Sequence, residues 1–274
     1  MFWQRLTRFR LKSLHVIVIM AIIVTAGATS VTASGTALST LSTGAPCAKD
    51  VLFIGARGSG EQYSENDGLG PAVKTTWTLL HNRLGDRVQM YALPYEALPV
   101  ESLFSKKGER DLFQSVETGR LLFTGTIRNR IRAWREAGCS TPLKILTAGY
   151  SQGAWVIGDG IHSLGNDERN LIAGIVLLGD PEYNHTSSVT RGEALDGIAG
   201  ARVPYVPAGM ANRMRSLCHD GDGVCNFTNR RLGVLLGACR KPGANGYTCA
   251  HFGYANPGPE AQFAGNYLAN RITG

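Results

Sequence analysis

The chain has 274 residues, of which 28 are Lys or Arg, 21 are Asp or Glu, and 43% are hydrophobic. The first 33 positions hold four of the basic residues and none of the acidic ones, so the rest of the chain carries a net charge of +3 in place of +7. This mild excess, without a cluster of Lys and Arg, gives no support for nucleic acid binding. The roughly 240 residues that follow are enough for one hydrophobic core in a single α/β domain.

The first 33 residues have the layout of a secretory signal peptide. Four basic residues between Arg5 and Lys12 precede an apolar run over residues 14–26, and small residues follow up to Ala33. A retained membrane anchor is the alternative, but the run is shorter than the ~20 residues of a spanning helix. We expect a secreted, extracellular protein that contacts a membrane or the cell envelope only through an uncleaved leader. Residues 34–46 are small and polar, which predicts a flexible lead-in to one folded domain over residues 47–274.

Four short apolar runs alternate with segments of helical length along this domain. The runs are rich in β-branched residues or leucine and are typical of a buried parallel sheet; they cover residues 51–55, 88–93, 143–149 and 171–178. Amphipathic spacing predicts helices over residues 70–84 and 112–137, the second interrupted around Gly125, with further helices over 154–164 and 259–272. The fold class expected is α/β, with helices covering both faces of a central, mainly parallel sheet in three layers.

All the cysteines lie beyond the leader, and an even number in an exported chain suggests disulfides. Fifteen pairings of the six are possible in principle. Local spacing favours two small loops and one long-range bond, namely Cys218–Cys225, Cys239–Cys249 and Cys47–Cys139. Zinc ligation is the competing interpretation, but the sequence has no C-x2-C pair, so we expect no metal site.

The sequence Gly149-Tyr150-Ser151-Gln152-Gly153 stands between an apolar run and a predicted helix. A G-x-S-x-G motif at a strand-to-helix turn is typical of a nucleophile elbow, where small neighbours allow the sharp turn that exposes the serine hydroxyl. The alternative is a glycine-rich turn with an exposed serine. The strand before and the helix after favour the elbow.

A serine nucleophile needs a histidine base and a carboxylate that orients it. His185, His219 and His251 all follow the elbow. Asp222 lies inside the predicted Cys218–Cys225 loop, and His251 follows Cys249 by two residues, so disulfides would fix both side chains. His219 and its neighbour Asp220 are interpreted as solvated loop residues, and Asp180 as a structural carboxylate at a strand end.

These residues resemble those of the cutinase family. The motifs that carry the resemblance are Ala56-Arg57-Gly58-Ser59-Gly60-Glu61, Tyr150-Ser151-Gln152-Gly153-Ala154, Cys218-x3-Asp222-x2-Cys225 and His251-x2-Tyr254, together with the positions of Cys47 and Cys139. The resemblance covers the chain from about Cys47 to the C-terminus. It implies an α/β-hydrolase fold and cofactor-free hydrolysis of carboxylic esters, with Ser151 as nucleophile, Asp222 as orienting acid and His251 as base.

The resemblance also implies an oxyanion hole. The backbone N–H of Gln152 is expected to be one donor, since it directly follows the nucleophile. Ser59 matches the second donor, through its N–H and in part its hydroxyl, in a loop that follows the first strand. A tight glycine turn without a catalytic role is the alternative for this loop.

The sequence departs from the family pattern between Asp222 and His251, where the gap is long and contains an apolar run over residues 233–237 and the Cys239/Cys249 pair. This insertion has two interpretations, an acyl pocket or flap and a surface insertion. The substrates expected are cutin-like polyesters, lipids or short-chain esters, at an insoluble surface or in solution, cleaved by a monomer without a cofactor. Alternatives are an acetylxylan or mycolyl esterase, an acyltransferase with the same triad, and a noncatalytic surface-binding protein.

Overall fold

The computed structural model describes residues 46–100, 102, 105–227, 250–254 and 258–274. All of these lie in one compact unit over residues 45–274. Within the described part, no helix is long and apolar enough to span a membrane.

Six parallel strands form one sheet in the order β2-β1-β3-β4-β6-β5. The four predicted strands are present as β1 (Val51–Ala56), β2 (Val88–Ala92), β3 (Lys144–Tyr150) and β4 (Ile172–Leu178). The sheet continues with β6 (Met214–Leu217) and β5 (Thr190–Arg191), which the sequence did not predict because neither contains an apolar run. Since parallel strands share one direction, the loops that follow β1, β3 and β6 emerge at the same edge of the sheet.

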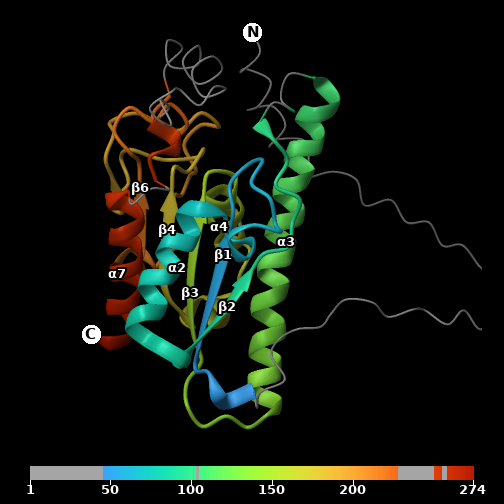
Figure 1. The fold of residues 1–274 in the computed structure, drawn as a ribbon, viewed down its shortest axis with the longest axis vertical. Helices are drawn as coiled ribbons and strands as arrows, with labels where there is room; N and C mark the ends of the chain where they lie inside the picture. Colours follow the sequence, from blue (N-terminus) through green and yellow to red (C-terminus); the bar gives the residue numbers. More distant parts are fainter. Residues whose placement is uncertain (1–45, 101, 103–104, 228–249, 255–257) are drawn as a thin grey trace, which may run out of the picture. The chain divides into compact units, whose positions relative to one another are not determined.

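Helices cover both faces of the sheet, as Figure 1 shows. Helices α2 (Gly70–Leu84) and α7 (Pro259–Thr273) pack together over one face, and α3 (Lys106–Glu136) and α4 (Gln152–His162) over the other. The α/β three-layer prediction is therefore confirmed. The shorter helices are η2 (Pro46–Ala48), η3 (Asn66–Gly68), η4 (Gly85–Arg87), α5 (Asn166–Asn170), η6 (Ala211–Arg213) and η8 (Ala250–Phe252).

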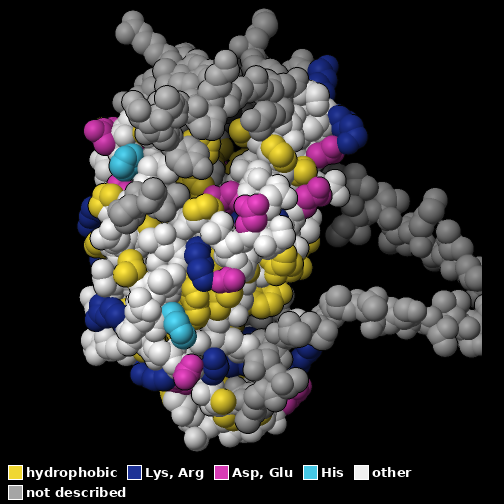
Figure 2. Space-filling view, viewed as in Figure 1, with side chains coloured by type: hydrophobic (Ala, Val, Ile, Leu, Met, Phe, Trp, Pro, Cys, Tyr) yellow, Lys and Arg dark blue, Asp and Glu magenta, His cyan; other side chains and the backbone are white. Residues whose placement is uncertain are grey.

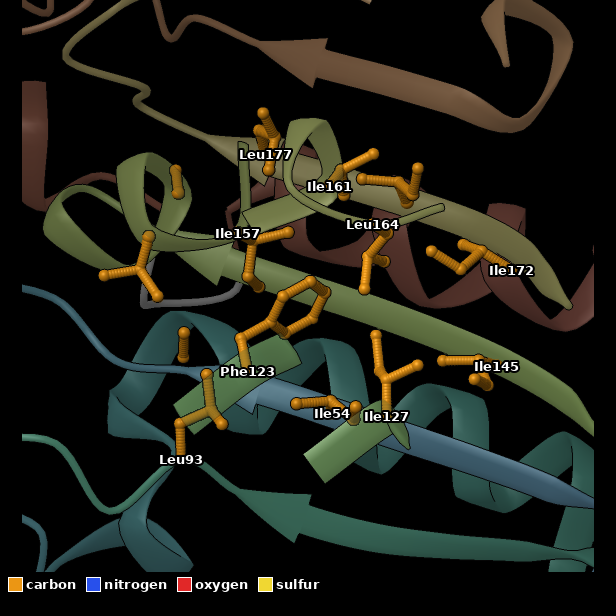
Figure 3. Packing of buried hydrophobic residues seen from close by; sticks show 14 of the residues in the cluster. Ile54, Leu93, Phe123, Ile127, Ile145, Ile157, Ile161, Leu164, Ile172 and Leu177 are labelled. Carbon is orange, nitrogen blue, oxygen red and sulfur yellow. The ribbon is translucent and has the colours of Figure 1, made fainter. Parts of the chain in front are cut away.

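Two hydrophobic clusters, one on each face, hold the layers together. Along β1, Leu52 and Ile54 face the α3/α4 side, whereas Val51 and Phe53 face the α2/α7 side, as the period of two in a strand requires. All six residues of β1 are buried, which explains its continuous apolar run. Figure 3 shows Phe123 of α3 lying among Ile54, Ile157 and other aliphatic side chains.

The predicted interruption at Gly125 was wrong, because α3 runs without a break from Lys106 to Glu136. A glycine inside a helix costs about 1 kcal/mol relative to alanine. Here Phe123 and Ile127, on either side of the glycine, are fully buried in the core. Burial of one such side chain contributes about 1.5–3 kcal/mol, so packing outweighs the local preference.

Two disulfides are present among the described residues, Cys47–Cys139 and Cys218–Cys225. Both are pairs that the cysteine spacing favoured. The third predicted pair, Cys239–Cys249, and the insertion around residues 233–249 lie outside the described residues, as do the leader and most of the lead-in.

The face drawn in Figure 2 carries Lys and Arg side chains interspersed with Asp and Glu rather than gathered in one patch. Several basic side chains are paired with acids on the surface, including Arg87 with Asp50 and Arg128 with Glu168. A surface of mixed charge does not attract a polyanion in the way that a basic stripe does.

Candidate active site

The turn between β3 and α4 places Ser151 in an unusual backbone conformation. Ser151 has φ 53° and ψ −118°, a positive φ that non-glycine residues seldom adopt. The glycines beside it are needed for close approach: a Cβ on Gly149 would lie 2.4 Å from the carbonyl oxygen of Gly153, and one on Gly153 would lie 2.1 Å from that of Ala56. The turn therefore has the strand–turn–helix geometry that the motif predicts.

Three side chains from separate segments meet at this turn. Ser151 Oγ lies 2.9 Å from His251 Nε2, and His251 Nδ1 lies 2.9 and 3.0 Å from the two carboxylate oxygens of Asp222. With Nδ1 protonated, the imidazole donates to Asp222 and accepts the hydroxyl proton of Ser151. Asp222 is fully buried, and Ser151 and His251 are 7% and 9% exposed. The structure thus brings together the three residues that the sequence singled out.

The Asp222 carboxylate is held from several sides. Besides the imidazole, Oδ1 accepts the backbone N–H of Val224 at 2.8 Å, and Oδ2 accepts the hydroxyl of Tyr254 at 2.8 Å. Burial by itself would raise the pKa of Asp222, but the charge of His251 and these hydrogen bonds hold the pKa below its usual value. Asp222 is therefore a stable anion, suited to orient a histidine and to stabilise its protonated form.

The imidazole of His251 is fixed by aromatic neighbours. The ring of Tyr150 stacks on it with a centroid separation of 5.0 Å, and the Tyr150 hydroxyl donates to the backbone carbonyl of His251 at 2.6 Å. Tyr254 packs edge-on against the same imidazole at 6.1 Å. The 3-10 helix that carries His251 is only one turn long, so these contacts, together with Asp222, hold the imidazole in place.

The two expected oxyanion donors lie in segments that pack against each other. Gln152 is the first residue of α4, where a backbone N–H has no partner within the helix. A Cβ on the next residue, Gly153, would lie 2.1 and 2.6 Å from the carbonyl oxygens of Ala56 and Arg57, so the start of α4 touches the loop that carries Ser59. The Ser59 hydroxyl donates its one proton to the carbonyl of Leu98.

Glu61, in the same loop, ends the first of the motifs that carry the family resemblance, but the sequence did not indicate that its carboxyl is buried. Its Oε2 accepts the backbone N–H of Gly58 at 2.6 Å, and Arg57 Nε donates to its carbonyl oxygen at 2.7 Å. Burial raises the pKa of Glu61 to about 7. An acid next to a glycine turn usually lies in solvent, so the motif by itself did not predict this buried environment.

These elements match a known family over most of the chain. The model of the family described as "Cutinase" matches residues 47–236, a segment that contains Ser151 and Asp222 and ends before His251. The chain belongs to the cutinase family. It is therefore a carboxylic ester hydrolase.

Individual cutinase relatives agree with this assignment. "Probable cutinase 3" of Neosartorya fischeri is 28% identical over 233 residues, which are 84% of this chain and 83% of the relative. A cutinase-like protein from Cryptococcus sp. superposes with a TM-score of 0.57 at 20% identity, covering 84% of this chain and 97% of the other. The catalytic core of an acetyl xylan esterase from Trichoderma reesei gives a TM-score of 0.59 at 18% identity, covering 82% and 100%. The two structures establish the shared fold.

Asp180, His185 and His219 have partners outside the proposed triad. Asp180 is fully buried and pairs with Arg202 and Tyr205, each at 2.7 Å, which agrees with a structural role at the end of β4. The prediction that His219 is solvated was wrong in part, because its Nδ1 lies 2.7 Å from Glu260 at the start of α7. His185 forms an exposed pair with Asp196.

Among the described residues, Cys218, Asp222 and Cys225 place potential metal-ligand atoms within 4.8 Å of one another. The two sulfurs are bonded to each other and are not thiolates, and the carboxylate already accepts several hydrogen bonds. This group belongs to the disulfide-braced acid loop and does not fit a metal ion.

Proposed function

We propose that this cutinase-family protein is a secreted serine esterase in which Ser151, His251 and Asp222 form the catalytic triad. The observation that carries the proposal is the continuous contact from Ser151 Oγ to His251 Nε2 and from His251 Nδ1 to Asp222, each at 2.9 Å. Such contact between nucleophile, base and orienting acid is what acyl transfer to a serine requires.

The reaction begins with attack of Ser151 Oγ on the ester carbonyl carbon, while His251 Nε2 takes the hydroxyl proton. The tetrahedral oxyanion accepts hydrogen bonds from the N–H groups of Gln152 and Ser59. As the intermediate collapses, the bond to the leaving alcohol breaks and His251 returns the proton to that alcohol. Water then attacks the acyl-enzyme while His251 takes its proton; the bond from the acyl carbon to Ser151 Oγ breaks, His251 returns the proton to Oγ, and the free acid leaves. Asp222 stabilises the imidazolium in both steps.

The substrate class is carboxylic esters of lipids, cutin-like polyesters or small alcohols, without a cofactor. One of the similar structures is an acetyl xylan esterase, so short acyl esters of a polysaccharide belong to the same proposal. We further propose that residues 1–33 are a cleaved leader, 34–46 a lead-in and 47–274 the catalytic domain, acting as a monomer. The two disulfides fit an extracellular protein.

Hydrolysis of p-nitrophenyl esters from acetate to palmitate, by the wild type and by Ser151→Ala, tests the proposal. The variant is expected to lose activity by a factor on the order of 10⁴–10⁶, because the triad acts as a unit. A short-chain optimum would indicate acetyl or polyester substrates, and a long-chain optimum lipids. Equal activity of the two proteins would contradict the role of Ser151, and acylated sugar in the presence of a sugar acceptor would identify an acyltransferase.

A further inference from the structure

A buried side-chain hydrogen bond joins helices α3 and α4 directly behind the nucleophile. Gln152 Nε2 donates to Ser115 Oγ at 2.9 Å, and the two residues are 3% and 6% exposed. The other end of the amide, Gln152 Oε1, is buried and has no hydrogen-bond partner within the described part of the chain. The bond to Ser115 therefore determines how the side chain of Gln152 is held.

The hydroxyl of Ser115 also forms a hydrogen bond to a third segment of the chain. A serine hydroxyl has one proton to donate. Because Ser115 accepts from Gln152, that proton is available for the backbone carbonyl of Glu96, to which Ser115 Oγ donates. Glu96 lies in the segment of residues 93–100 that follows β2. The Ser115 hydroxyl thus accepts one hydrogen bond and donates another, which fixes the direction of both.

The same segment also holds the loop of the second oxyanion donor. The Ser59 hydroxyl donates to the carbonyl of Leu98, and the backbone N–H of Gly60 donates to the carbonyl of Ala97 at 2.8 Å. Between these points the segment is braced by a bond from the N–H of Leu98 to the carbonyl of Glu96 at 3.0 Å. Residues 96–98 thus contact both Ser115 and the loop that carries Ser59.

We propose that Ser115 is a positioning residue that couples the two halves of the oxyanion hole. It does not touch substrate; it links the residue that carries one N–H donor, Gln152, to the loop that carries the other, Ser59. The two donors must converge on one oxygen at about 3 Å, and a misplacement of about 1 Å costs up to 10²-fold in rate. This inference rests on the proposed function, since it assumes the oxyanion roles given there.

The test is Ser115→Ala. This substitution removes the hydrogen bonds to Gln152 and Glu96 and leaves the backbone N–H groups of Gln152 and Ser59 present. We expect kcat to fall 10- to 100-fold with KM within about twofold of the wild type, because the oxyanion exists in the transition state and not in the bound ester. An alkylboronic acid, whose tetrahedral adduct on Ser151 places an oxygen in the hole, is expected to inhibit the variant more weakly by a similar factor.

The matched control is Thr124→Val, which removes another buried hydroxyl from α3. Thr124 is 2% exposed, and its hydroxyl donates to carbonyls of α3 itself. It is therefore not part of the chain of hydrogen bonds from Gln152 through Ser115 to Glu96, which we call the relay. This variant is expected to lose some thermal stability and to keep the wild-type kcat and boronate affinity. Gln152→Met, which cuts the relay at its other end, is expected to lower kcat as Ser115→Ala does, and the double variant to lower it no further.

The outcomes separate this inference from the proposed function. A folded Ser115→Ala protein with wild-type kcat and boronate affinity would overturn the relay and leave the triad untouched. If Ser115→Ala does not fold, Gln152→Met alone decides, and an unchanged kcat in it overturns the relay. A wild type without esterase activity would overturn the proposed function together with the inference.

Discussion

Tyr254 lies outside the proposed triad and contacts its acid, Asp222, directly. Its hydroxyl donates to Asp222 Oδ2 at 2.8 Å and accepts the backbone N–H of His219 at 2.7 Å. We predict that Tyr254→Phe lowers the free energy of unfolding by about 1.5–3 kcal/mol, the usual contribution of a hydrogen bond to a charged group, and lowers kcat. Urea unfolding and ester hydrolysis measure the two effects.

Tyr205→Phe provides the matched control for this prediction. Tyr205 is likewise buried, and its hydroxyl donates at 2.7 Å to a buried carboxylate, that of Asp180, which does not belong to the triad. This variant is expected to lose comparable stability and to retain kcat. Equal losses of kcat in both variants would mean that Tyr254 acts through stability alone.

Glu61 makes the stability of the fold depend on pH. Its pKa rises from an ordinary value of 4.5 to about 7 because the carboxyl is buried, against the opposing effect of the Gly58 N–H and the charges of His251 and Arg57. The folded chain therefore holds this proton to higher pH than the unfolded chain does. The resulting destabilisation is absent below about pH 4.5 and complete above about pH 7.

Glu61→Gln removes this titration. Between pH 5 and pH 8 the wild type is expected to lose stability, on the order of 2–3 kcal/mol, that Glu61→Gln does not lose. Thermal unfolding of both proteins over this pH range measures the difference. Parallel pH profiles of the two melting temperatures would show that Glu61 ionises as a solvent-exposed acid does.

At the residue scale, the sequence indicated the members of the proposed triad because each had a distinct local signal. Ser151 stood in a glycine-flanked turn, and Asp222 and His251 stood beside cysteines. Ser115 had no such signal, since its role depends on contacts with segments that only folding brings near, and the motif that contains Glu61 did not reveal its burial. Ser115 meets Gln152 from 37 positions away, and nothing in its own neighbourhood on α3 distinguishes it from any other helical serine.

At the element scale, the two disulfides are expected to act differently. Cys47–Cys139 closes a loop of 92 residues, whereas Cys218–Cys225 closes one of 7 and brackets Asp222. In the loop-entropy account the long loop contributes about 4–5 kcal/mol to stability and the short one less than about 3 kcal/mol. Replacing both cysteines of a pair by serine should therefore cost more stability for Cys47–Cys139 and more activity for Cys218–Cys225.

Melting temperatures and kcat of the two double variants, measured side by side, check this prediction. Loss of kcat in the Cys47/Cys139 variant at a temperature where it remains folded would contradict it. So would full activity after removal of Cys218–Cys225, because the loop that presents the Asp222 carboxylate would then need no covalent brace.

The helices and strands themselves were predictable to different degrees. Helix α2 begins and ends where its amphipathic pattern does, and β1 to β4 lie within a residue or two of the apolar runs. Strands β5 and β6 were not predictable, because two and four residues carry too little pattern and are ordered by neighbours already in the sheet. The continuity of α3 through Gly125 also depends on tertiary packing, which a local propensity does not contain.

At the scale of the whole molecule, the core clusters formed by the described residues extend from Val51 to Ala269. We predict that a chain without residues 1–33 has the same melting temperature and kcat as the secreted protein. We also predict that this chain is not secreted into the culture medium. N-terminal sequencing of the secreted protein locates the cleavage site. A drop in melting temperature of several degrees on deleting the leader would contradict the assignment of these residues.

The hydrogen bond between Ser151 and His251 joins positions 100 residues apart in the chain. Contacts of such long range form late in folding, because the loop between them must close before they contribute. Trp134 and Trp155, in contrast, lie on α3 and α4, which pack together and are separated in the chain only by β3 and its loops. During refolding, the fluorescence of these tryptophans should therefore recover before ester hydrolysis does. The return of enzymatic turnover would then report when the last step of assembly is complete.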